Sequence, residues 1–201
     1  MSMIANSTGL AKKIFTLSDT MFCYMSKAIE PLSYKKYAHE GSDHTREFIT
    51  YDYSSGNVNV HAKLTRNDKL RHDTIITSTQ CIYDMMTVTY FARTLDFEQM
   101  KKGDSKNSML INGRSKVEMK INHNGKEQIE GNDGKKYDCI VLTLVINTSA
   151  FEDQKEAMKI YSTNDANRIP IRINSKLKVG STSAVIKEIS GNKHPLPATT
   201  K

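Results

Sequence analysis

Alternating hydrophobic and polar positions run through most of the chain and predict antiparallel strands. In the segment 58–64 the alternation is strict, with Val58, Val60 and Ala62 on one face, which is typical of a half-buried strand. The run 140–146 is almost continuously apolar, so its strand should lie centrally with both faces covered. Expected strands, bounded by turn residues, cover 12–17, 20–28, 32–39, 46–53, 58–64, 70–77, 108–111, 117–123, 128–130, 137–147, 157–163, 168–179 and 182–189.

The segment 78–103 differs from its surroundings because its apolar residues recur at helical spacing. They fall at i, i+3, i+4, i+7 and i+8, which predicts a helix over about 79–93. A second, short helix is expected over 97–102, ended by Gly103. The residues that carry the main helical pattern are Ile82, Met85, Met86, Thr89 and Tyr90.

The two patterns together predict a mainly β, α+β fold. A helix that is apolar over most of its surface must be enclosed. We therefore expect a strongly curved antiparallel sheet, or partial barrel, packed around one central helix. One domain is expected over 1–191, followed by a flexible tail, 192–201.

Two turns give the sequence its clearest hairpin signals. Asn124-Gly125 should join the strands 117–123 and 128–130, because Asn-Gly favours the tight turns of two-residue hairpins. Asn132-Asp133-Gly134 should form the next turn, before the strand 137–147.

The surface of the predicted helix offers a candidate site for an apolar ligand. Methionine side chains adapt to variable lipid chains, although a plain packed core explains the same stripe. Asp84 is a charged residue inside this apolar helix, where the macrodipole near the N-terminus stabilises it. The candidate ligand-binding residues are Met85, Met86, Tyr90 and Phe91.

A net charge of +7 makes anionic partners plausible without selecting one. In the strand 168–179, basic residues alternate with isoleucines, so one face could meet an anionic polymer or a protein partner. An ordinary solvated edge explains the same pattern. No aromatic residues are interleaved, and nucleic acid is not expected. The basic residues are Arg168, Arg172, Lys176 and Lys178.

Sequence motifs for catalysis or cofactor binding are missing, so we expect neither an enzyme nor a cofactor. The segment HEGSDH is the densest group of possible metal ligands and the basis of a rival, enzymatic hypothesis. A polar turn around Gly41-Ser42 is the simpler interpretation, because the spacing fits no standard metal motif. Its candidate ligands are His39, Glu40, Asp43 and His44.

Three cysteines cannot form a closed disulfide framework. Cys23 and Cys139 lie in apolar strand faces and should be buried. Cys81 lies near the start of the predicted helix, where the macrodipole could lower its pKa, although an inert packed thiol is the simpler interpretation.

Three segments resemble, in order and spacing, the family called domain of unknown function 3108. They are CIYDMMTVTYFARTLDFEQMKKGD, NHNGKEQIEGNDGKKYDC and STNDANRIPIRINSKLKVGSTSAVIKEISG, and the resemblance spans 12–191. It implies an exported, periplasmic or envelope protein of Gram-negative bacteria with a β-rich, barrel-like domain, and no established activity. Members typically carry further strands before the part that matches 12–25, so an unpaired sheet edge is expected here. Residues 1–19 do not have the pattern of a signal peptide.

Together these inferences favour a non-enzymatic envelope protein that binds or carries an apolar or amphiphilic, lipid-like component. The alternative is a surface module that binds anionic polymers, or another envelope protein, through its basic strand face.

Overall fold

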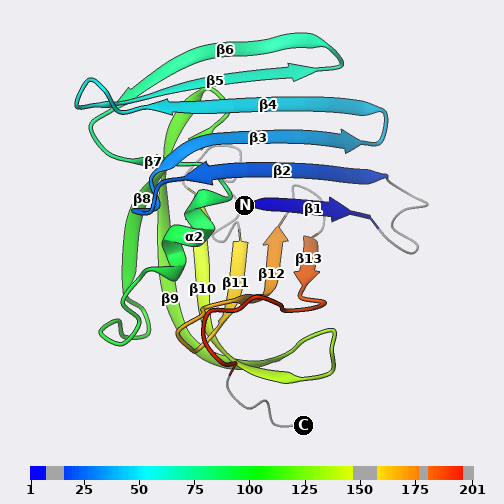
Figure 1. The fold of residues 1–201 in the computed structure, drawn as a ribbon, viewed down its shortest axis with the longest axis vertical. Helices are drawn as coiled ribbons and strands as arrows, with labels where there is room; N and C mark the ends of the chain where they lie inside the picture. The colour runs from blue at the N-terminus through cyan, green and yellow to red at the C-terminus, as the bar shows by residue number, and fades with distance from the viewer. Residues whose placement is uncertain (8–15, 147–157, 177–180, 197–201) are drawn as a thin grey trace. The chain divides into compact units, whose positions relative to one another are not determined.

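A computed structural model describes residues 1–7, 16–146, 158–176 and 181–196, and its strands form two sheets (Figure 1). The chain divides into two compact units: unit 1 is Met1–Phe91 with Met109–Val117, and unit 2 is Ala92–Ser108 with Glu118–Lys201. The fold is mainly β, as predicted, but it has two sheets where the pattern predicted one curved sheet. The single-domain expectation stays a prediction, because two compact units can belong to one folding domain.

The six-stranded sheet is an antiparallel meander in which every strand pairs with its neighbours in sequence. Figure 1 shows it in blue to cyan. The predicted strands between 20 and 77 are all present, shifted by a few residues. The predicted strand 12–17 lies mostly outside the described residues. The six strands are β1 (Ser2–Asn6), β2 (Leu17–Met25), β3 (Pro31–Glu40), β4 (Asp43–Asp52), β5 (Val58–Arg66) and β6 (Lys69–Ser78).

Strand β1 was not predicted. It pairs with the edge of β2 that was expected to be unpaired. It pairs along its whole length with β2, from Ser2 opposite Phe22 to Asn6 opposite Ser18. The edge of the sheet is therefore β1 itself.

Helix α2 (Thr87–Arg93) is shorter than the predicted helix 79–93. The residues before it form the two-residue strand β7 (Ile82–Tyr83), which pairs in parallel with β8 (Ser105–Asn112), and a turn at 85–86. A β-branched and an aromatic residue at 82 and 83 favour a strand, and this preference prevails over the helical spacing. Asp84 consequently precedes the helix instead of lying inside it.

The predicted second helix, 97–102, is wrong. This segment forms turns, in which the Asp96 carboxylate accepts hydrogen bonds from the backbone nitrogens of Glu98 and Gln99. Such side-chain bonds compete with helical hydrogen bonds. Gly103 has a φ of 100° and ends the segment with a bond from its nitrogen to the His123 carbonyl.

The seven-stranded sheet has the order β13-β12-β11-β10-β9-β8-β7. As predicted, the apolar strand β10 lies between two partners, and its residues from Cys139 to Leu144 are buried on both faces. The predicted strand 168–179 begins at Pro170, and residues 177–180 lie outside the described part. The strands after β8 are β9 (Ser115–Glu130), β10 (Lys136–Ile146), β11 (Met158–Thr163), β12 (Pro170–Lys176) and β13 (Ser181–Val185).

The hairpin predicted at Asn124-Gly125 is wrong, because β9 runs through both residues. Its register against β10 shifts there: Ile140 faces Lys126, whereas Leu142 faces His123, so β9 carries one extra residue. This is a β-bulge, and Gly125 adopts a φ of 92° within it. The positive φ that makes Asn-Gly suitable for a turn serves the bulge equally well. The turn predicted at 132–134 is confirmed and joins β9 to β10.

The predicted flexible tail is described as far as residue 196, and part of it is fixed in unit 2. The Asn167 side chain accepts a hydrogen bond from the His194 nitrogen and donates one to the His194 carbonyl, each 2.9 Å long. Residues 197–201 lie outside the described part. Within the ranges described, no helix is long and apolar enough to cross a membrane.

Candidate functional site

One face of the six-stranded sheet, which we call the inner face, is buried and changes character along its strands. The register aligns Cys23, Tyr34, Ile49 and Ala62 in one row across four strands. Two residues further along, roughly 7 Å away, the next row aligns Met21, Lys36, Glu47 and Leu64. We call the two parts the apolar zone (Cys23, Tyr34, Ile49, Tyr51, Val60 and Ala62) and the charged zone (Asp19, Lys36, Glu40 and Glu47).

The charged zone gathers three carboxylates around one ammonium group. Lys36 Nζ lies 3.2 Å from Asp19 Oδ2 and 3.6 Å from Glu40 Oε1, and Glu47 faces Lys36 across the strands. Burial raises the pKa of Glu47, while the Lys36 charge lowers it and the Asp84 charge raises it further. The zone therefore has more hydrogen-bond acceptors than its own cation can satisfy.

Asp19 is the most buried member of the charged zone, with 6% of its surface exposed. Its Oδ2 pairs with Lys36, but its Oδ1 is buried and has no hydrogen-bond partner within the described part of the chain. Buried polar atoms in folded proteins almost always have a partner, so this oxygen is an exception that needs an explanation.

The apolar zone is covered by residues of unit 1. Ile82, Met86 and Ile111 belong to its hydrophobic cluster. Further residues are only partly buried against the cluster and form its margin: Met25, Tyr53, Ile76 and Met109.

Of the predicted ligand-binding residues, Met86 lies in this cluster, whereas the other three are half-buried. Phe91 stacks on Tyr83, with ring centroids 4.7 Å apart. Whether Met85, Met86, Tyr90 and Phe91 meet a ligand stays a prediction.

Asp84 is 1% exposed and caps helix α2. Its Oδ1 accepts hydrogen bonds from the backbone nitrogens of Met86 (2.9 Å) and Thr87 (2.8 Å), and its Oδ2 accepts one from Thr87 Oγ1 (2.7 Å). These bonds satisfy donors that a helix start leaves free. Burial still raises the pKa of Asp84 above its ordinary value, because the hydrogen bonds offset the desolvation only in part.

Like His72 Nε2, which lies opposite Leu64 on the same face, the Tyr51 hydroxyl is a further buried polar atom that lacks a partner in the part of the chain that the structure describes. Its hydroxyl has no hydrogen-bond partner within the described residues, whereas the neighbouring Tyr53 hydroxyl donates to the Pro31 carbonyl at 2.8 Å. Burial is the main cause that raises the pKa of Tyr51, and the charge of Asp84 adds to it. Leaving a buried hydroxyl unsatisfied costs about 1–3 kcal/mol.

Tyr51 and Asp19 mark the two ends of a strip along the inner face. Through Ala38, Asp19 aligns with Thr45, which lies six residues before Tyr51 on β4. At about 3.4 Å per residue the strip is roughly 20 Å long. It has an unsatisfied polar atom near each end, and between them lie first the row of Lys36 and Glu47 and then the apolar zone.

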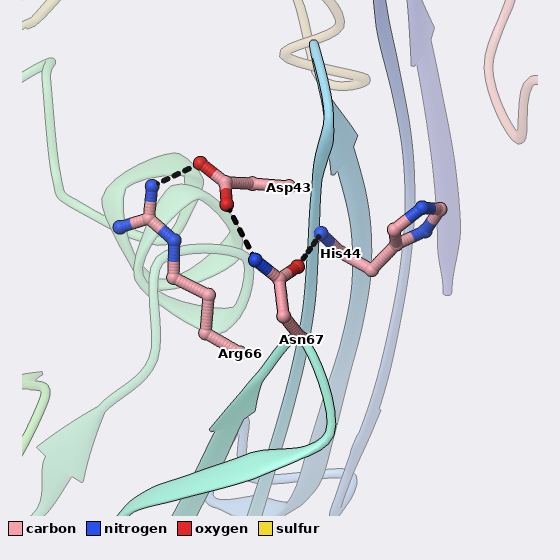
Figure 2. Close-up of polar contacts among 4 residues, drawn as sticks. All are labelled: Asp43, His44, Arg66 and Asn67. Atoms are coloured by element: carbon pink, nitrogen blue, oxygen red, sulfur yellow. Dashed lines mark hydrogen bonds and ion pairs between the residues drawn. The ribbon is translucent and has the colours of Figure 1, made fainter.

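The geometry divides the HEGSDH segment between the two faces of the sheet. His39 and His44 face each other across β3 and β4 with exposed rings whose centroids lie 4.0 Å apart. Glu40 points to the inner face, toward Lys36. Figure 2 shows the Asp43 carboxylate bound to Arg66 and Asn67, with the His44 ring directed away from it. The four side chains do not converge, and no group of three or more possible metal ligands exists in the described ranges.

Two of the four basic residues predicted as a surface are engaged inside unit 2. Arg168 lies before β12 with a φ of 52°, and its guanidinium sits 4.6 Å from the centre of the Phe97 ring. Arg172 donates to the Glu130 carbonyl at 3.0 Å. The Lys176 side chain and Lys178 lie outside what the structure describes, so a shared anionic-partner surface stays a prediction.

The cysteines are free thiols. Cys23 and Cys139 are fully buried, as predicted. Cys81 is half-buried and lies six residues before α2 begins, so the helix start predicted beside it is absent. Burial raises its pKa, contrary to the lowering that a helix N-terminus would give.

Sequence reasoning did not single out Asp19, Lys36, Glu47 or Tyr51. The available signal was the position of each residue within its strand, two or four residues from a buried neighbour on the same face. Which residues meet across the strands depends on the register, which the sequence pattern did not provide.

The fold and the inner face define a mainly β protein whose first sheet carries an apolar zone next to a charged zone. Residues 1–187 match the model of the family described as "Protein of unknown function (DUF3108)", and the chain belongs to this family. The match confirms the resemblance and extends it to the residues that form β1. Neither a curated protein nor a solved structure shows a significant match to the chain.

Proposed function

We propose that this protein binds and carries an amphiphilic, lipid-like component of the cell envelope on the inner face of its six-stranded sheet. The observation that carries the proposal is that two buried polar atoms of the inner face, Tyr51 Oη and Asp19 Oδ1, have no partner among the described residues and lie near the two ends of a strip that runs from the charged zone into the apolar zone. A ligand with polar groups and an apolar body would satisfy both atoms and extend the contacts of the strip.

The charged zone favours a ligand whose polar end donates hydrogen bonds. Asp19, Glu40 and Glu47 bring three carboxylates against the single ammonium of Lys36. An amine or hydroxyl head group complements this excess of acceptors, whereas a bare carboxylate or phosphate would be repelled.

The apolar part of the ligand would lie at the margin of the apolar zone, where Met25, Tyr53, Ile76 and Met109 are only partly buried. The turn at 85–86 and the start of α2 would form its cover, so Met85, Met86, Tyr90 and Phe91 are part of the proposed lining. A strongly curved sheet or partial barrel is included in the proposal, because curvature gives the ligand an enclosed path.

We also propose that the protein acts without catalysis, in the periplasm or cell envelope of a Gram-negative bacterium. This part rests on the resemblance of the family to exported β-rich proteins. Another envelope protein that delivers or receives the ligand is the expected partner.

The test compares two amphiphiles that share a tail length, dodecylamine and dodecanoate. We expect the purified chain to bind the amine at least about tenfold more tightly in calorimetric titrations below the micelle concentration. Native mass spectrometry and lipid extraction of the same protein, expressed in a Gram-negative host, should reveal a co-purified amphiphile.

Asp19→Asn is the informative variant and Asp52→Asn is its matched control. Both substitutions remove one carboxylate charge, but Asp19 is buried on the inner face and Asp52 is exposed. Only the first should weaken the binding of dodecylamine. A lipid-free preparation that binds neither amphiphile, or equal effects of the two variants, overturns the proposal.

A further inference from the structure

The hairpin between β3 and β4 holds its two histidines in a fixed register on the exposed face, opposite the inner face. The loop is Gly41-Ser42, and the φ of Gly41 is 64°, whereas Ser42 does not have a positive φ. A positive φ at the first central residue alone is the conformation of a type II′ turn, which suits two-residue hairpins. The turn places Glu40 opposite Asp43 and, one step further from the loop, His39 opposite His44.

The backbone contacts of His44 identify the kind of cross-strand pair. Its nitrogen donates to Asn67 Oδ1 and its carbonyl accepts from the Asn67 nitrogen, both at 2.8 Å. Figure 2 shows the first of these bonds. Since both backbone groups of His44 face away from β3, the His39–His44 pair is of the non-hydrogen-bonded type. In such pairs the side chains are closest, with Cα atoms about 4.5 Å apart.

The end of this hairpin is also anchored by side chains. The Asp43 carboxylate binds Arg66 and accepts a hydrogen bond from Asn67 Nδ2 at 2.7 Å (Figure 2). Asn67 thus connects to Asp43 through its amide nitrogen and to His44 through its amide oxygen. These contacts fix the backbone of β4 at His44. For both imidazoles to bind one ion, only the side chains of His39 and His44 have to rotate.

We propose that His39 and His44 form a surface two-histidine site for a divalent transition-metal ion, with Cu²⁺ bound more tightly than Ni²⁺ or Zn²⁺. Imidazole nitrogens bind such ions at about 2.0–2.1 Å, so two of them on one ion lie roughly 3 Å apart. The two rings are tilted by 36° with centroids 4.0 Å apart, which is within reach of this spacing. Water completes the coordination, and the preference for Cu²⁺ follows the general order of divalent ions on nitrogen ligands.

The charges around the pair allow a cation to bind. Arg46 is the charged residue next to His44 on the same face of β4, and its guanidinium is paired with Asp68 at 3.2 Å. The neighbours of His39 on this face are Tyr37 on β3 and Ser18, its register partner on β2. Protons compete with the metal for both imidazoles, so affinity should fall as the pH is lowered.

Three single variants of the full chain test the site: His39→Ala, His44→Ala and, as control, His61→Ala. His61 is exposed on the same face of the sheet, on β5, but its ring pairs with Asp73. We expect one Cu²⁺ per wild-type chain in calorimetric titration, with two nitrogen ligands in its electron paramagnetic resonance spectrum. Either substitution in the pair should weaken binding by about tenfold or more, and His61→Ala should leave it unchanged.

A thermal measurement with Zn²⁺ gives a second readout on the same four proteins that does not depend on the copper titration. Zn²⁺ should raise the Tm of the wild-type chain and of His61→Ala, because binding to the folded state stabilises it. The rise should be lost in the other two variants. Equal affinity in all four proteins, or only about a twofold loss per histidine as for independent weak sites, overturns the proposal.

Discussion

Asp84 and Asp19 are both buried carboxylates of unit 1, but they differ in how far the protein satisfies their oxygens with hydrogen bonds. Asp84 receives two backbone hydrogen bonds and one hydroxyl bond from the start of α2. Asp19 has one lysine partner, and its second oxygen has no partner among the described residues. Burial of a charged group is costly unless it is bonded. The hydrogen bonds of the fold therefore account for the burial of Asp84, whereas the second oxygen of Asp19 is the atom that the proposed ligand would satisfy.

The largest effect is expected when the Asp84 cap is removed. Asp84→Ala should lower the free energy of unfolding by about 3 kcal/mol, because it removes an N-cap and leaves the buried nitrogens of Met86 and Thr87 without an acceptor. Urea denaturation measures the change. The control is Asp96→Ala, which removes a similar acceptor from an exposed turn and should cost less than about 1 kcal/mol. Equal effects at the two positions would contradict a structural role of burial at Asp84.

The next effect concerns the pH dependence of stability. The pKa of Asp84 is raised in the folded state, mainly by burial, so the folded chain holds this proton more tightly than the unfolded chain. Its contribution to stability is complete below the unfolded pKa of about 4 and is lost as the pH rises through the folded pKa. Asp84→Asn keeps an acceptor at the cap and should flatten this decline.

The decline in stability is measured as the free energy of unfolding at several pH values from about pH 4 to pH 8. Glu47 has a raised pKa with the same sign, so part of the slope should remain in Asp84→Asn and disappear when Glu47→Gln is added. An unchanged slope in both variants would show that neither carboxylate is held in its protonated form by the fold.

The smallest effect has opposite signs at two neighbouring tyrosines. Tyr51→Phe should raise the free energy of unfolding by up to about 1 kcal/mol, because it removes a buried hydroxyl that lacks a partner. Tyr53→Phe should lower it by about 1 kcal/mol, since it breaks the bond to the Pro31 carbonyl. Chemical denaturation of the ligand-free protein compares them. A loss of stability in Tyr51→Phe would mean that its hydroxyl does have a partner.

Most strands could be predicted from the sequence, because strict alternation, as in β5, or a short continuous apolar run, as in β10, leaves few alternatives. The long helix could not, because Ile82 and Tyr83 satisfy a helical period and a strand preference at once. Only the pairing of β7 with β8 decides between them. The charged zone could not be predicted for a similar reason. Asp19, Lys36 and Glu47 are ordinary polar residues in the sequence, and only the register of β2, β3 and β4 brings them together.

The bulge at Gly125 allows a single strand to contribute to the packing on both faces of its sheet. In the sequence, the apolar residues Met119, Ile121 and Ile129 of β9 all fall on odd positions, as if they shared one side. The extra residue reverses the alternation, so Met119 and Ile121 align with even-numbered residues of β10 and Ile129 with Tyr137. Ile129 and Tyr137 belong to a cluster with Cys139 and Val141. A one-residue deletion at the bulge would restore the simple alternation and turn one of these apolar sets to the wrong side.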